Sequence, residues 1–351
     1  MGQSGRRQGR QGRQGGGQGA GADDDAEAAL DKETDTLLVQ ELEKMSLQER
    51  EQVLYEIHGV DDKMKETTEL VQKSLRELNQ MLDEESSKIN AANHAVASHP
   101  TPDESTENPL QYVLRYQTTK TRYVRSGPFL LMFLRSERYD PTLAFTRLKL
   151  FLRFKASLFG LESLQREHVT FDDMIKDGED SDTMKTLLCG YTQVLKQRDR
   201  AGRAIWFSLT HLRFDKPFDS ICKTWFYLIM GEIQNNVETQ LNGIIVVRFD
   251  YGERPDNSNN NVGPGGPSGG PAVAKTSSID HYKKFQELIT ALPFRLISIH
   301  ICNIKPLSVI QKVISEGVAS VGKQARTRIR FHNGRSLFPI SKGSMPCRML
   351  C

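Results

Sequence analysis

Apolar residues recur every three or four positions over residues 31–85, which is the spacing of one face of a helix. The pattern predicts three amphipathic helices. Ser46 followed by Glu49 matches a capping box at the start of the second helix, and Gly59 stands where that helix would stop. The three apolar groups are Leu37, Leu38, Leu42 and Met45; Val53, Leu54 and Ile57; and Leu70, Val71, Leu75, Leu78 and Leu82.

A second helical block is predicted over residues 110–159, after a linker rich in proline and polar residues. Its centre is an apolar turn at residues 129–134, followed by a charged turn and an Asp140-Pro141 break. A helix with this pattern is expected to be buried at one end.

Short apolar runs alternate with helical patterns in the last part of the chain. Residues 204–208, 241–249 and 294–301 are predicted strands, and residues 218–237 and 279–292 are predicted helices. This alternation favours an α/β fold whose sheet has parallel members.

The strand at residues 241–249 is apolar on both sides. Its side chains alternate between the two faces, so Ile244 and Val246 lie on one face and Ile245, Val247 and Phe249 on the other. We therefore expect a central strand that is covered on both faces by protein or by ligand.

Composition divides the chain into segments. A Gly/Gln/Arg-rich and acidic tail and an insertion of Asn, Gly, Pro and Ser are too polar to bury a core, and we predict that both are disordered. The predicted organisation is a tail at 1–30, a helical N-terminal region at 31–97, a linker at 98–109, a helical bundle at 110–184, and an α/β domain at 185–351 with the disordered insertion at 256–270.

Charge and motif content argue against several functions. The chain carries 47 basic and 44 acidic residues, so no overall charge favours nucleic acid as a partner. No apolar run reaches the roughly 18 residues of a membrane span, and no secretory leader is recognisable, so a cytoplasmic location is expected.

Candidate chemistry is sparse. The five cysteines have no metal-like spacing, and the sequence has no nucleophile elbow, zinc-protease motif or phosphate loop. His300 alternates with isoleucines and is interpreted as a core histidine. We expect no enzyme activity, no catalytic residue, no metal and no cofactor.

Four segments resemble, in order, the motifs of the CRAL-TRIO lipid-binding family. They are Phe-Leu-Leu-Met-Phe-Leu-Arg-Ser-Glu-Arg-Tyr-Asp at 129–140, Asp-Arg-Ala-Gly-Arg-Ala-Ile at 199–205, Gln-Leu-Asn-Gly-Ile-Ile-Val-Val-Arg-Phe-Asp-Tyr-Gly at 240–252, and Pro-Phe-Arg-Leu-Ile-Ser-Ile-His-Ile-Cys-Asn at 293–303. The resemblance covers residues 110–334. The insertion and the short polar C-terminus depart from the family pattern.

The resemblance implies an N-terminal helical bundle followed by a mixed, partly parallel sheet, flanked by helices that enclose a lipid cavity under a mobile gate helix. It also suggests which residues form the site. We expect the pocket to include Trp225, Ile229, Ile244, Val246 and Phe249; the gate helix to include Leu307, Ile310, Val313 and Ile314; and the headgroup or membrane contacts to include Arg203, Lys305, Lys323, Arg326, Arg328 and Arg330.

The implied function is binding, and intermembrane transfer or presentation, of a phospholipid, phosphoinositide or isoprenoid-like lipid. The protein would be cytoplasmic and would contact anionic or phosphoinositide-containing membranes transiently. An alternative is a ligand-free interaction scaffold with a degenerate pocket, in which the N-terminal helices dock a protein partner.

Overall fold

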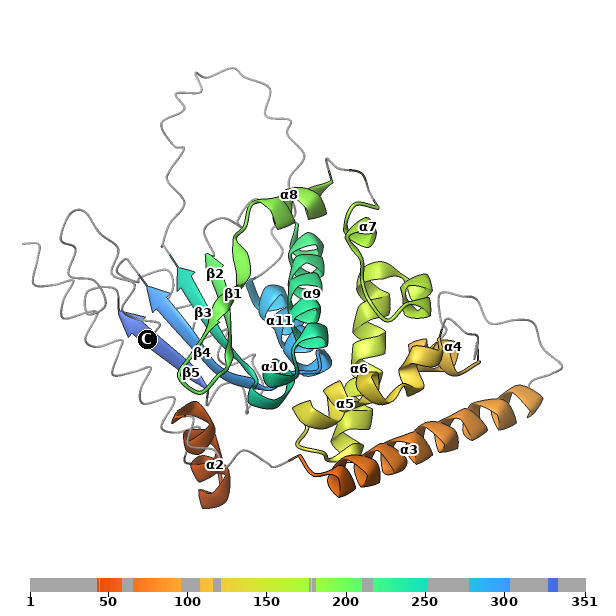
Figure 1. Cartoon of the computed structure of the whole chain (residues 1–351). Helices are drawn as coiled ribbons and strands as arrows, with labels where there is room; N and C mark the ends of the chain where they lie inside the picture. Colours follow the sequence, from red (N-terminus) through yellow and green to blue (C-terminus); the bar gives the residue numbers. More distant parts are fainter. Residues whose placement is uncertain are drawn as a thin grey trace, which may run out of the picture.

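A computed structural model of the chain describes residues 43, 45–58, 66–95, 108–115, 121–176, 178, 181–209, 217–250, 278–303 and 328–333. The predicted tail, most of the first predicted helix, the insertion and the predicted gate residues lie outside these ranges. The helical part comprises α2 (Leu47–His58), α3 (Thr68–Ala95), α4 (Pro109–Arg115), η2 (Arg122–Arg125), α5 (Gly127–Ser136), α6 (Pro141–Phe159), η3 (Leu161–Gln165), α7 (Phe171–Met174) and α8 (Asp182–Leu188). The second part comprises β1 (Thr192–Arg198), β2 (Ala204–Leu209), α9 (Phe218–Asn235), α10 (Val237–Asn242), β3 (Ile244–Asp250), α11 (Ser278–Ala291), β4 (Leu296–Asn303) and β5 (Ile329–Asn333) (Figure 1).

Short polar residues fix the starts of the helices. At α2 the predicted capping box is present, because the Glu49 amide donates to Ser46 Oγ at 3.2 Å and the Ser46 amide donates to Glu49 Oε2 at 2.8 Å. At α6 the Asp140 carboxylate accepts from the amides of Thr142 and Leu143. These caps satisfy amides that have no partner within the helix.

The apolar stripe of α3 is part of the main core. The helix continues to Ala95, beyond the predicted end near residue 85, and Leu78 and Leu82 are fully buried in the same cluster as the residues of α5 and α6. Ser74 donates to the carbonyl of Tyr139, and Arg125 pairs with Asp83 at 2.6 Å. The helix α3 and the following bundle therefore share one core.

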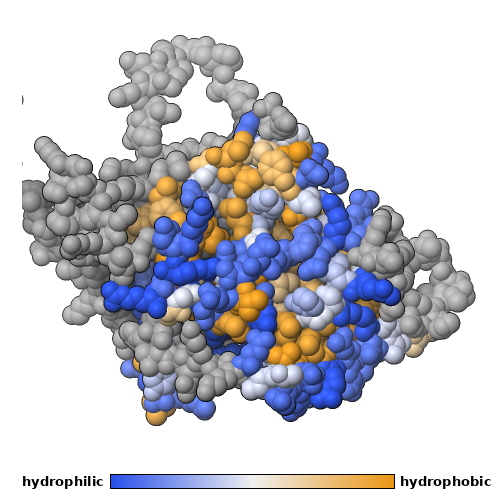
Figure 2. Space-filling model, viewed as in Figure 1, coloured by the Kyte–Doolittle hydropathy of each residue, from blue (hydrophilic) through white to orange (hydrophobic). Residues whose placement is uncertain are grey.

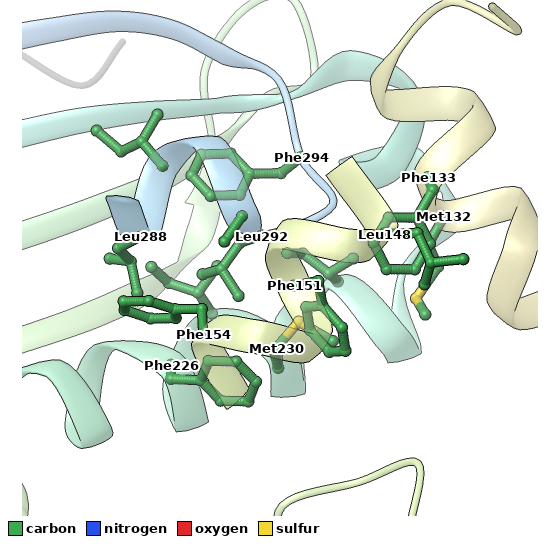
Figure 3. Close-up of a cluster of buried hydrophobic side chains, with 14 of the residues drawn as sticks. Met132, Phe133, Leu148, Phe151, Phe154, Phe226, Met230, Leu288, Leu292 and Phe294 are labelled. Atoms are coloured by element: carbon green, nitrogen blue, oxygen red, sulfur yellow. The ribbon is translucent and has the colours of Figure 1, made fainter. Parts of the chain in front are cut away.

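Aromatic side chains join the helical part to the sheet part. Figure 3 shows Phe133, Leu148 and Phe151 packed towards Phe226 and Met230 of α9. The rings of Phe151 and Phe226 are stacked with centroids 5.6 Å apart. This contact makes the packing of α9 depend on α6.

The guanidinium of Arg147 on α6 caps a second helix of the sheet part. It donates to the carbonyl of Leu292 at 2.7 Å and to that of Ile289 at 3.0 Å, at the end of α11. Carbonyls at a helix C-terminus have no partner within the helix, so Arg147 fixes the position of α11 on the bundle.

The five strands form one mixed sheet in the order β1-β2-β3-β4-β5. β1 pairs with β2 in antiparallel orientation, and β2 to β5 are parallel to one another. Figure 1 shows α9 and α11 on one side of the sheet. This confirms the predicted α/β class and the three predicted strands. The predicted helix at 218–237 ends at Asn235, and Asn236 caps the separate helix α10 by accepting from the Thr239 amide.

Candidate functional site on the second face of the sheet

The face of the sheet towards α9 and α11 is packed core. Trp206 of β2 meets Trp225 of α9 edge to face at 5.7 Å, and Trp225 meets Phe285 of α11 at 5.5 Å. Ile244 and Val246 of β3 are buried in the same cluster, as is Ile229 of α9. Protein side chains therefore fill this face.

The opposite face, which we term the second face, carries the alternate residues of each strand. Phe207, Val247 and His300 are direct neighbours across β2, β3 and β4, and the Phe207 and Phe249 rings lie 5.4 Å apart. Phe207, Val247 and Phe249 are half-buried, whereas Val246, which precedes Val247 and lies on the core face, is buried. Apolar side chains on β2 and β3 thus form one half of the second face.

The structure divides the five predicted pocket residues between the two faces. Trp225, Ile229, Ile244 and Val246 lie in the helix-packed core, and only Phe249 lies on the second face. The five residues do not line one surface. Alternation along β3 already put Phe249 on the face opposite Ile244 and Val246; the sequence could not show which of the two faces the helices cover, because the strand is apolar on both sides.

Polar residues of β4 and β5 occupy the other half of the second face. Ser298 Oγ lies 2.9 Å from His300 Nε2, and His300 Nδ1 lies 2.8 Å from His332 Nε2. The two imidazoles are nearly parallel, with an angle of 13° and centroids 5.0 Å apart. Ser298, His300 and His332 therefore form a continuous hydrogen-bonded chain, which we term the histidine pair with its serine.

The surroundings keep both imidazoles neutral. Burial lowers the pKa of His300 to about 4, and the charges of His332, Arg330 and Arg203 act in the same direction. Burial, followed by the charge of Arg330, also lowers the pKa of His332. A neutral imidazole has one N–H donor and one acceptor nitrogen, so two neutral rings can form the His300–His332 hydrogen bond.

Three of the predicted headgroup residues can be placed. Arg203 is buried and pairs with Asp199, whose carboxylate also accepts from the Arg203 amide at 2.8 Å. Arg330 lies directly opposite His300 in the β4–β5 register. Arg328 donates to the carbonyl of Ile297 at 3.3 Å. The other predicted residues lie outside the described ranges, namely Lys305, Lys323, Arg326 and the gate residues Leu307, Ile310, Val313 and Ile314.

The order Ser298, His300, His332 has the connectivity of a nucleophile, a general base and an orienting group. Here the third member is an imidazole and not a carboxylate, and the neighbouring charges are cationic. Both features disfavour an imidazolium at His300, so this base is weak near neutral pH. In the described part of the chain, no group of three His, Cys, Asp or Glu side chains is arranged to hold a metal ion.

Apolar surface elsewhere is interrupted by hydrophilic residues. Figure 2 shows apolar residues near α8 and, lower in the view, near α10 and α5, with hydrophilic residues between them. Leu188 and Val237, at the ends of α8 and α10, are among the exposed large apolar residues. Within the described residues, no helix combines the length and apolar character needed to cross a membrane.

Comparison with known proteins adds little to this site. No family model matches the chain. Among solved structures, the crystal structure of Sfh5 is similar over 75% of this chain and 81% of its own, with 12% identity and a TM-score of 0.37. A likeness of this size carries no argument about the ligand, so the family resemblance rests on the four sequence motifs.

Proposed function

We propose that the protein is a non-catalytic carrier that binds one hydrophobic ligand against the second face of the sheet. The observation that carries this proposal is the division of that face into two halves. Phe207, Val247 and Phe249 form a half-buried apolar half, and the histidine pair, close to Arg203 and Arg330, forms a polar half. A molecule with an apolar body and a polar head matches both halves.

The energetics of such a carrier favour exchange with membranes. Removing roughly 16 methylenes from water is worth about 13 kcal/mol at 0.8 kcal/mol each. A bilayer provides the same stabilisation, so transfer between bilayer and protein is nearly neutral when the site closes over the chain. The predicted gate residues would supply this closure, as the family resemblance implies.

Native mass spectrometry of the purified full-length protein tests the proposal. We expect an added mass of one lipid-sized ligand on the parent protein. Phe249→Glu should reduce the occupancy at least tenfold, because an ionised carboxylate without a partner is costly against an apolar ligand. Leu188→Glu, at a side chain that is 73% exposed on α8, is the matched control and should retain the ligand.

Circular dichroism must show that both variants are folded. Equal occupancy in the parent and in folded Phe249→Glu would remove the second face from the binding site. Should Phe249→Glu fail to fold, Phe249→Ser, which adds no charge, provides the same comparison. A parent protein that is empty after purification and after incubation with liposomes would contradict the carrier function.

One observation favours a second candidate function, a protein-interaction module. The stripe of α3 is used in the protein's own core, but α2 exposes Leu47, Leu54 and Tyr55 by 71%, 43% and 51%. Exposed apolar side chains grouped on one short helix are typical of a docking segment. This module is the function expected if no ligand is found.

A further inference from the structure

The second face of the sheet is not equally open along its strands. Ile205, Ile245 and Ser298 are direct neighbours across β2, β3 and β4, and they are only 2%, 8% and 1% exposed. We term these three residues the first row. The next row on the same face, which includes Val247 and His300, is half-buried. Protein therefore covers the first row, near the beginnings of the parallel strands, and leaves the next row partly open.

The helix α2 lies on this covered part of the sheet. It contacts β4, and Figure 1 shows it below the sheet, apart from α9 and α11. Val53 of α2 and the preceding Met45 are buried, but neither belongs to the main core that contains the helix-facing side chains of β4. Because the helices of the main core occupy one face, α2 meets β4 on the other face, where Ser298 of the first row lies.

The attachment of α2 to the sheet is small. Within the described part of this segment, Met45 and Val53 are its buried apolar side chains, and Arg50 turns back to donate to the carbonyls of Met45 and Glu43. A helix of 12 residues is only marginally stable in water without packing. A helix that is held by few buried apolar contacts opens at a low free energy.

The chain is anchored again just before α3, independently of α2. The guanidinium of Arg135 on α5 donates to both carboxylate oxygens of Glu66, at 2.8 and 3.0 Å. Leu78 and Leu82 then fix α3 in the main core. Release of α2 from the sheet therefore leaves the attachment of α3 in place.

We propose that α2 is a detachable cover of the first row, and that α2 and the hydrophobic ligand compete for this part of the second face. This inference rests on the proposed function and names how access to its site is controlled. When α2 leaves, the apolar half of the site extends from Phe207 and Val247 to Ile205 and Ile245. The larger apolar surface binds the ligand more tightly, whereas a seated α2 lowers the apparent affinity.

Two adjacent substitutions on α2 test the cover in the full-length protein. Val53→Asp places an unpaired charge against the sheet and should detach α2. Leu54→Asp makes the same kind of change at a side chain that is 43% exposed, and it is the matched control. Hydrogen exchange at the amides of residues 51–58 should be at least about tenfold faster in Val53→Asp than in the parent. It should stay close to the parent in Leu54→Asp, and the amides of β2 and β3 should remain protected in both variants.

Ligand uptake shows whether the cover controls the site. Ligand-free protein is incubated with liposomes of phosphatidylcholine that contain monooleoylglycerol, and native mass spectrometry measures the occupied fraction. The liposome concentration at half occupancy should be at least about tenfold lower for Val53→Asp than for the parent, because a ligand of the parent must first displace α2. Leu54→Asp should match the parent.

The outcomes separate the cover from the carrier function. If Val53→Asp detaches α2 but takes up lipid no better than the parent, the cover is wrong and the carrier function stands. The cover is also wrong if α2 exchanges equally fast in the two variants, or if Val53→Asp lowers the urea midpoint reported by Trp206 and Trp225 in the main core. If Val53→Asp does not fold, Val53→Ser against Leu54→Ser makes the same comparison. If neither the parent nor a variant takes up lipid, both proposals are wrong.

Discussion

Gly243 links α10 to β3, and replacing it with alanine should be among the most damaging single-methyl additions in the protein. The residue has φ 82° and ψ −170°, a backbone conformation that residues with a Cβ rarely adopt. A Cβ built there would lie 2.7 Å from the carbonyl oxygen of Arg295 and 2.8 Å from Cγ1 of Ile297. The obstacle includes backbone of the segment entering β4, which cannot rotate away as a flexible side chain can.

The magnitude combines two costs. Holding alanine in this backbone conformation costs about 1–3 kcal/mol. Moving the segment at Arg295 and Ile297 to relieve the overlap costs about 1–3 kcal/mol more. We therefore expect Gly243→Ala to lower the free energy of unfolding by about 4 kcal/mol, a large part of the roughly 5–15 kcal/mol of a typical domain.

Urea denaturation measures this loss directly. The two tryptophans, Trp206 and Trp225, both lie between the sheet and α9, so their fluorescence reports the unfolding of this core. Gly231 is the matched control, because it is exposed within α9 and an added Cβ would meet no atom within 4 Å. Gly231→Ala should stabilise the protein by about 0.5–1 kcal/mol. A Gly243→Ala variant within 1 kcal/mol of the parent would refute this reasoning.

Three further predictions concern ionisable groups. Burial lowers the pKa of Lys155 from 10.5 to about 7, so the unfolded chain binds more protons than the folded protein between about pH 7 and 10.5. The free energy of unfolding should therefore rise with pH in that window. Lys155→Met should flatten this rise, as measured by urea denaturation at several pH values. The pKa of His300 falls from 6.5 to about 4 on folding, so the ligand-free protein should lose stability as the pH drops from about 6.5 to 4. The melting temperature of His300→Asn should depend less on pH in this range than that of the parent, and an equal dependence would contradict the prediction. The hydrogen bond from Arg135 lowers the pKa of Glu66, so Glu66→Gln should cost at most about 1 kcal/mol at pH 7, and the cost should shrink as acid protonates Glu66 in the parent, as measured by chemical denaturation at neutral and at acid pH.

Helices and central strands were predictable because their patterns are local. The capping box at Ser46 indicates a helix start, and the apolar run of β3 indicates a strand, each from a few neighbouring residues. β1 was not predicted, since Val194 and Leu195 are its only apolar residues and much of the strand is exposed at the edge of the sheet. Gly202, with φ 77°, closes the turn between β1 and β2, and a turn of this kind indicates a strand on each side.

The site was less predictable than the fold because it depends on register. His332 was not predicted as a partner of His300, because 32 residues separate them and only the pairing of β4 with β5 brings them together. The strand pattern of each segment is consistent with several registers. Ile244 and Val246 were predicted to line the pocket for a related reason: alternation defines two faces of a strand, and only tertiary packing shows which face the helices cover.

The strand order has a consequence for how such a protein can diversify. From β2 to β4 each strand is laid beside the previous one, and the intervening helices α9 and α11 lie on the same side. Neighbouring positions of β3 thus have different surroundings: Val246 is buried against the helices, whereas Val247 is half-buried on the second face, where the proposed ligand would bind. Under the proposed carrier function, a lineage could change its ligand through the half-buried positions Phe207, Val247 and Phe249 and leave the helix-packed core intact.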